Sequence, residues 1–126
     1  MEHNIIMKKM ITIIEFAGFL SQVGSSISAE ERDEFITYIA KNPEVGNIMP
    51  GTGGVRKVRW GSKDKGKSGG IRVIYYYYNE YAPIFLLTVY GKGEKENLSP
   101  EQKKQISVLA QVLKAECKLN RSQHHD

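Results

Sequence analysis

The fold of this chain is decided by residues 51–90, GTGGVRKVRWGSKDKGKSGGIRVIYYYYNEYAPIFLLTVY. Within them, three runs are rich in β-branched and aromatic residues: Val55–Trp60, Ile71–Tyr78 and Ile84–Tyr90. The segments that join these runs consist largely of Gly, Lys, Ser, Asn and Pro. Strand-forming runs separated by turn-forming residues predict an antiparallel meander.

Positive charge is concentrated in the first half of this stretch. Between residues 56 and 72 the chain has seven basic side chains and one acid, a net charge of +6, whereas the whole protein carries only +4. An excess packed into one segment indicates a polyanionic partner. Nucleic acid is expected rather than a membrane, because a membrane-binding segment would place its cations on an amphipathic helix. The basic residues are Arg56, Lys57, Arg59, Lys63, Lys65, Lys67 and Arg72.

The flanking segments predict a strand and helices around the meander. A short buried strand is expected at Ile11–Phe16, followed by one or two helical turns over Ala17–Val23. A longer helix should begin at Ser28, which has Glu at the capping-box spacing, and end near Lys41, before Asn-Pro. We therefore expect an α+β domain: a small antiparallel β-sheet, made of the meander and the N-terminal strand, with two N-terminal helices and a C-terminal helix.

The C-terminal helix is predicted from a second capping motif at Ser99–Gln102. Its apolar stripe has helical spacing, and we expect Val108 and Val112 to widen it. The tail from Asn120 is expected to be frayed. The stripe consists of Ile106, Leu109, Ala110, Leu113 and Cys117.

Length and composition limit the number of domains, the cofactors and the cellular location that we expect. The 126 residues, 40% of them hydrophobic, are expected to form one domain, 1–126, with its core at roughly 11–118. Cys117 is the only cysteine, which excludes an internal disulfide and a cysteine-based zinc site, so we expect no metal or other cofactor. No apolar run approaches the roughly 20 residues that cross a bilayer, and no signal peptide is recognised. A cytoplasmic protein without a membrane partner is expected.

The basic meander is the candidate site. Alternate residues of a strand share a face, so Lys57 and Arg59 should point one way and Arg56 the other. Arg72 would join the first two if the register of the strands brings it to the same side, and Lys92 could close the far end. The alternative is an ordinary solvated sheet face, although such a face normally mixes charges of both signs.

Further groups could hold a nucleic acid beside these cations. Lys63, Lys65 and Lys67 alternate with Gly and Ser in the loop 61–70, which could follow a phosphate backbone or be simply a solvated hairpin loop. The four tyrosines 75–78 should alternate across the sheet, two in the core and two outward or in a groove. Aromatic rings beside a basic groove can stack on single-stranded RNA bases, although core packing is the alternative for each tyrosine. Tyr90 is the strongest candidate, because it ends a strand near Lys92.

Three blocks of this sequence resemble the RelE/ParE toxin superfamily, specifically its HigB-like branch: GTGGVRKVRW, GKSGGIRVIYYY and IFLLTVYGKGEKENL. The resemblance covers roughly residues 11–115. It implies a compact, RelE-like toxin of a type II toxin–antitoxin pair, with a cognate antitoxin that typically has a DNA-binding domain. RelE-like members enter the ribosomal A site and cleave the mRNA there.

The resemblance also suggests residue roles. The two-cation strand motif of the family matches Lys57 and Arg59, its central-strand arginine matches Arg72, and its cation after the last strand matches Lys92. The family's C-terminal tyrosine has no counterpart after Asn97, so Tyr90 is our substitute candidate. We take all five as candidate catalytic residues, and Arg56, Lys63, Lys65 and Lys67 as candidate RNA-binding residues.

The expected activity is ribosome-dependent mRNA endoribonuclease, with the RNA 2′-OH attacking the adjacent phosphate. Two other functions remain open at this point. The superfamily contains ParE-like toxins that target gyrase, and a fold alone does not select the target. A non-catalytic module that binds single-stranded RNA would use the same cations without cutting.

Overall fold

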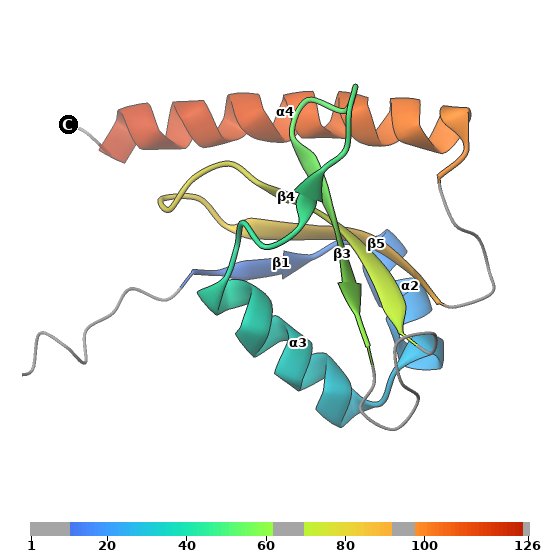
Figure 1. Ribbon diagram of the computed structural model, residues 1–126. Helices are drawn as coiled ribbons and strands as arrows, with labels where there is room; N and C mark the ends of the chain where they lie inside the picture. The colour runs from blue at the N-terminus through green and yellow to red at the C-terminus, as the bar shows by residue number, and fades with distance from the viewer. Residues whose placement is uncertain (1–10, 62–69, 92–97, 125–126) are drawn as a thin grey trace, which may run out of the picture.

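The computed structural model describes residues 11–61, 70–91 and 98–124, with side chains described as far as residue 120 of the last helix. Its described elements are three helices and a five-stranded sheet, which confirms the predicted α+β class (Figure 1). In chain order they are β1 (Ile13–Glu15), α2 (Ala17–Ser26), α3 (Ala29–Lys41), β2 (Asn47–Ile48), β3 (Val55–Trp60), β4 (Ile71–Tyr77), β5 (Ile84–Gly91) and α4 (Pro100–His124).

The strands lie in the order β1-β5-β4-β3-β2. β3, β4 and β5 form the antiparallel meander that the sequence predicts. The sheet as a whole is mixed rather than antiparallel, because β1 runs parallel to β5, with Ile13 beside Ile84. Two helices separate β1 from the rest of the sheet. No tight turn therefore fixes its direction, and a connection of this length allows a parallel pairing.

The short strand β2 lies between α3 and the meander, where no strand was predicted. It pairs antiparallel with β3. The turn between the two strands is held by the Thr52 hydroxyl, which donates to the Met49 carbonyl oxygen at 2.7 Å. Gly51, Gly53 and Gly54 have positive φ in this turn, a conformation that glycine adopts without steric cost. Two residues of strand are too few to produce an alternating pattern, so β2 could not be predicted from the sequence.

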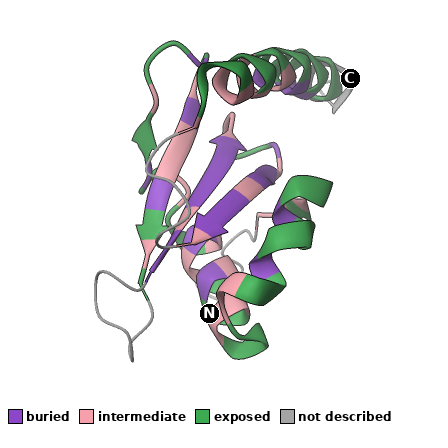
Figure 2. Cartoon of the chain, turned by 90° about the vertical axis from the view of Figure 1, so that its right-hand side faces the viewer, coloured by how far each residue is buried: buried purple, intermediate pink, exposed green. Residues whose placement is uncertain are grey.

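Helices cover both faces of the sheet (Figure 1). One face packs against α2 and α3, which contribute Phe19, Val23, Phe35 and Ile39 to its core. The other face packs against α4 through Ala110, Leu113 and Cys117. The central strands are consequently buried along most of their length (Figure 2).

This two-sided cover corrects the expectation for the four consecutive tyrosines. Tyr75 and Tyr77 belong to the core under α2 and α3, whereas Tyr76 and Tyr78 belong to the core under α4. The predicted alternation is present, but Tyr75 and Tyr76 are buried and the other two are half-buried. Two tyrosines are in the core as predicted, whereas Tyr77 and Tyr78 pack against the core and are half-buried instead of facing fully outward.

Both predicted capping boxes are present. The Ser28 hydroxyl accepts from the Glu31 N–H at 3.1 Å, and the Ser99 hydroxyl accepts from the Gln102 N–H at the same distance.

α4 differs from expectation on its outer side, where Val108 and Val112 are 52% and 54% exposed. Their predicted part in the buried stripe was wrong, because α4 meets the sheet along a narrow line. α4 also continues through the tail that we expected to fray.

Candidate functional site

The register of the meander gathers three of the predicted cations on one face. Arg59 lies directly opposite Arg72 across β3 and β4, and Arg72 lies opposite Tyr90 across β4 and β5. Directly opposed residues have Cβ atoms about 5 Å apart. Lys57 lies two residues from Arg59 on the same strand, so it faces the same way, about 7 Å along the strand. The structure therefore brings Lys57, Arg59, Arg72 and Tyr90 to the face that α4 partly covers.

Arg72 belongs to the cationic row, which we define as Lys57, Arg59 and Arg72. Its guanidinium is half-buried, and its Nη1 has no hydrogen-bond partner. A buried donor without a partner costs about 1–3 kcal/mol. Like charges placed directly opposite each other in a sheet destabilise it further. An anion bound between Arg59 and Arg72 would relieve both penalties, because it supplies an acceptor and the opposite charge.

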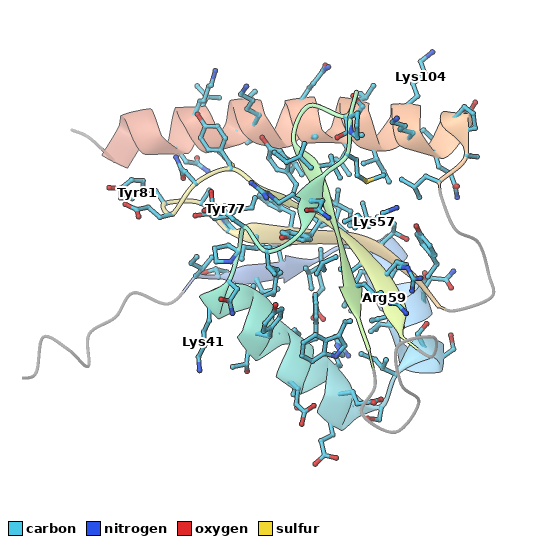
Figure 3. All side chains as sticks on the ribbon, in the orientation of Figure 1. Lys41, Lys57, Arg59, Tyr77, Tyr81 and Lys104 are labelled. Atoms are coloured by element: carbon cyan, nitrogen blue, oxygen red, sulfur yellow. The ribbon has the colours of Figure 1, made fainter. Side chains whose placement is uncertain are left out.

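Lys57 reaches into a pocket of about 360 Å³ that lies between the β2–β3 turn and the start of α4. In Figure 3 the side chains of Lys57 and Arg59 occupy the same side of the molecule, between α4 and α3. The pocket also contains Lys103, from the first turns of α4. Positive charge therefore extends from the cationic row on the sheet to Lys103 on α4.

Tyr90 is only 3% exposed and belongs to the core under α4. Its ring does not form an open platform on which a base could stack. It lines a second pocket, of about 280 Å³, that also contains the side chains of Gln22, Gln102 and Gln105. A role for Tyr90 in the chemistry remains a prediction that depends on access through this pocket.

Arg56 lies on the opposite face from the row, as the strand alternation predicts. Its Nη1 donates to the carbonyl oxygens of Glu44 and Gly46 at 3.0 and 2.7 Å. The Tyr75 hydroxyl donates to the Pro43 carbonyl oxygen and accepts from the Gly46 N–H, both at 2.8 Å. Both side chains thus hold the segment between α3 and β2. This geometry gives no support to the predicted RNA contact of Arg56.

The other predicted cations lie outside the described residues. These are Lys63, Lys65 and Lys67 of the loop between β3 and β4, and Lys92 after β5. Their roles stay predictions.

Sequence reasoning missed Lys103 as a site residue, although a signal was present. Lys103 falls three residues before Ile106, and positions 103, 106, 110, 113 and 117 continue one stripe at alternating spacings of three and four. A lysine at the end of a stripe that faces the sheet either extends past the apolar core or meets a charged ligand. The predicted stripe contains only its apolar members.

Two further properties of the described chain bear on the kind of site. Within residues 11–61, 70–91 and 98–124, no three His, Cys, Asp or Glu side chains gather into a group that could hold a metal ion. Over the same residues, no helix combines the length and apolar character needed to span a membrane.

Fold and site together define a small α+β domain that presents a row of cations on the partly covered face of its sheet. A family model described as the RelE toxin of the RelE / RelB toxin-antitoxin system matches residues 27–124. This match extends from the start of α3 to the end of α4, well over half of the chain. The protein belongs to the RelE toxin family, and it is accordingly the toxin of a toxin–antitoxin system, with an antitoxin as its partner.

Proposed function

We propose that this toxin is a ribosome-dependent endoribonuclease that cuts mRNA in the ribosomal A site and thereby stops translation. The observation that carries the proposal is the direct opposition of Arg59 and Arg72, with Lys57 beside them on the same face. Two guanidinium groups on neighbouring strands suit a phosphodiester, because each can donate two parallel hydrogen bonds to phosphate oxygens.

The proposed reaction needs no group beyond the RNA and the protein. The RNA 2′-oxygen attacks the adjacent phosphorus and forms a 2′,3′-cyclic phosphate, while the bond from phosphorus to the 5′-oxygen breaks. The proton of the 2′-OH passes to a base, and the departing 5′-oxygen receives a proton and becomes a 5′-OH. Negative charge increases on the phosphate oxygens in the transition state, and fixed cations at that point are commonly the largest contribution to catalysis.

We assign roles on this basis. Arg59 and Arg72 bind the non-bridging oxygens, Lys57 is the candidate base, and Lys92 or Tyr90 donates the proton or binds phosphate. General acid–base catalysis contributes about 10²–10⁴-fold, so its loss leaves some activity. The ribosome supplies much of the orientation of the mRNA, and the free protein should be a poor nuclease.

The same proposal places the toxin in the cytoplasm, where ribosomes and mRNA are found. We also propose that it belongs to the HigB-like branch, on the three sequence blocks described above, and that its antitoxin has a DNA-binding domain. A toxin that targets gyrase would have no use for the cationic row, which is why we favour the nuclease.

The proposal is tested by producing the toxin in cells and mapping the 5′ ends of mRNA. We expect new 5′ ends inside translated reading frames, with translation arrested before any change in DNA. Co-production of a protein encoded by a neighbouring gene should suppress both effects if that protein is the antitoxin. DNA breaks without new mRNA ends would instead identify a gyrase-directed toxin, and tight RNA binding without cleavage would identify a binding module.

A further inference from the structure

The outer side of α4 carries exposed apolar side chains. Val108, Val112 and Leu119 are 52%, 54% and 57% exposed, and Ala115 between them is exposed as well. We call these four residues the outer stripe. Figure 2 shows α4 as an outer layer of the molecule, with much of its surface exposed. Apolar side chains that gather on an exposed surface are typical of a site that binds another protein.

The outer stripe lies along one line of the helix. Its members follow one another at spacings of four, three and four residues, and on a helix of 3.6 residues per turn these spacings keep them on one side over about 16 Å. The opposite side of α4 packs on the sheet through Ala110, Leu113 and Cys117. A helix with one buried side is expected to be polar on the other. α4 is apolar on both sides, which is the pattern of a helix that packs against a partner on each of them.

Exposed lysines lie along one flank of the outer stripe. Seen down the helix axis, Lys104 and Lys118 lie about 50° and 90° to one side of its centre, whereas Glu116 lies about 70° to the other side. Lys104 points away from the sheet in Figure 3. Lys104 and Lys118 form no ion pair with another residue in the part of the chain that the structure describes. The flank therefore offers positive charge that acidic side chains of a partner would complement.

The shape of the outer stripe favours a helix as its partner. Side chains at this spacing interlock with those of a second helix laid along them, because the second helix presents the same repeat. Helices that bind in this way carry apolar anchors on one side and polar or charged residues beside them. The partner that family membership gives to this toxin is an antitoxin.

A second copy of the toxin fits the outer stripe poorly. Two copies packed antiparallel would place Lys104 of one helix beside Lys118 of the other, where like charges repel. Two copies packed parallel would share only about 12 residues, fewer than the three to four heptads of a coiled coil. An antitoxin helix carries charges of its own, and its chain can add contacts elsewhere on the toxin.

We propose that the outer stripe is a docking site for the antitoxin. An amphipathic helix of the antitoxin lies along Val108, Val112 and Leu119, and its acidic side chains face Lys104 and Lys118. This helix lies on the side of α4 away from the sheet, so it does not cover the cationic row. The docking site is independent of the proposed nuclease function, because it concerns the partner of the toxin and not its target.

Two sets of variants separate the apolar contact from the charged one. Val112→Glu and Leu119→Glu place a charge in the outer stripe, and Leu20→Glu is their control, because Leu20 is a 49% exposed apolar residue of α2. Lys118→Glu reverses a charge of the flank, and Lys41→Glu makes the same change in net charge at the exposed end of α3. Circular dichroism and thermal unfolding establish that each variant is folded.

The experiment measures the affinity of the purified toxin for its purified antitoxin, taken as the protein whose co-production with the toxin restores growth. Calorimetry is performed at low and at high salt. Val112→Glu and Leu119→Glu should bind at least about tenfold more weakly at both salt concentrations, because each disrupts a central contact. Lys118→Glu should bind several-fold more weakly at low salt and approach the wild type at high salt, because salt screens exposed charges. Leu20→Glu and Lys41→Glu should match the wild type.

Wild-type affinity in Val112→Glu and Leu119→Glu, or an equal loss in Leu20→Glu, would overturn the docking site. Equal effects of Lys118→Glu and Lys41→Glu would overturn the assignment of the basic flank. Light scattering on the toxin alone tests the second copy: a wild-type dimer that becomes monomeric in Val112→Glu would make the outer stripe an interface between copies and would also overturn the proposal. Failure of the nuclease function looks different, because the toxin would then produce no new mRNA ends in cells, whatever the affinities measured for the antitoxin.

Discussion

Arg59 lies directly opposite Arg72 across the antiparallel β3–β4 pair, so two guanidinium groups leave the same face of the sheet from neighbouring strands. This arrangement is unfavourable for folding alone, because like charges oppose each other and Nη1 of Arg72 has no partner. Side chains that lower the stability of the fold but can bind an anion are expected at a functional site.

Replacement of Arg72 by an apolar residue should therefore stabilise the protein. We expect Arg72→Leu to raise the free energy of unfolding by about 1 kcal/mol, because it removes the repulsion and the unpaired donor. Arg72→Lys keeps the charge and should give a smaller gain. Urea denaturation measures the free energy of unfolding of both variants. A clear loss of stability in Arg72→Leu would show that Arg72 supports the fold rather than only the site.

A second prediction concerns the Tyr75 hydroxyl, which bonds to two backbone groups of the segment before β2. Tyr75→Phe leaves the Gly46 N–H and the Pro43 carbonyl without this partner and should lower the free energy of unfolding by about 1–3 kcal/mol. Tyr81→Phe is the control. Tyr81 is 58% exposed, and its change should stay within about 0.5 kcal/mol. Similar values for the two variants would contradict the bracing role of Tyr75.

Tyr75 also makes stability depend on pH in the alkaline range. Burial raises the pKa of its hydroxyl above the ordinary value of 10.0, and the Gly46 hydrogen bond partly opposes this increase. The folded protein therefore holds the proton more tightly than the unfolded chain does. This contribution is fully present below about pH 10 and is lost as the pH rises through the raised pKa. Wild-type stability should fall more steeply than that of Tyr75→Phe in this range, as followed by thermal unfolding.

A fourth prediction tests the close packing of α2 on β5 with two glycines of the same helix. A Cβ atom at Gly18 would lie 2.8 Å from the Leu87 carbonyl oxygen, whereas one at Gly24 would meet nothing within 4 Å. Gly24→Ala should stabilise the protein by about 0.5–1 kcal/mol through reduced chain entropy. Gly18→Ala should destabilise it, because backbone of β5 must move. Equal increases in the free energy of unfolding for the two variants, measured by urea denaturation, would mean that α2 does not pack on β5 as described.

The parts of the fold that were predictable from sequence are those with local signals. The three runs of the meander alternate and end at turn formers, and both capped helices begin at Ser residues with the expected partner three positions on. The direction of β1 had no such signal, since it depends on how two helices cross the sheet. The burial of Tyr75 and Tyr76 likewise depends on cover from helices far away in the sequence.

In the candidate site, too, some features follow from local sequence patterns and others do not. Strand alternation alone placed Lys57 and Arg59 together and Arg56 on the other face. Whether Arg72 joined them depended on register, and a slip of one residue would have moved it to the opposite side. Helical spacing places Lys103 on the stripe that faces the sheet, but its approach to Lys57 follows from the path of α4 over the sheet.

The most direct test of the cationic row compares the cleavage of mRNA on ribosomes by wild type, Arg72→Ala and Lys41→Ala. Lys41 is exposed at the end of α3 and points away from the row, so its variant loses the same charge elsewhere (Figure 3). Circular dichroism and thermal unfolding confirm beforehand that each variant is folded. We expect Arg72→Ala to cut at least about 100-fold more slowly than wild type, because it loses a fixed cation at the charged phosphate, while Lys41→Ala cuts normally. A folded Arg72→Ala variant that cuts at the wild-type rate would contradict the assignment of the row as the phosphate-binding site.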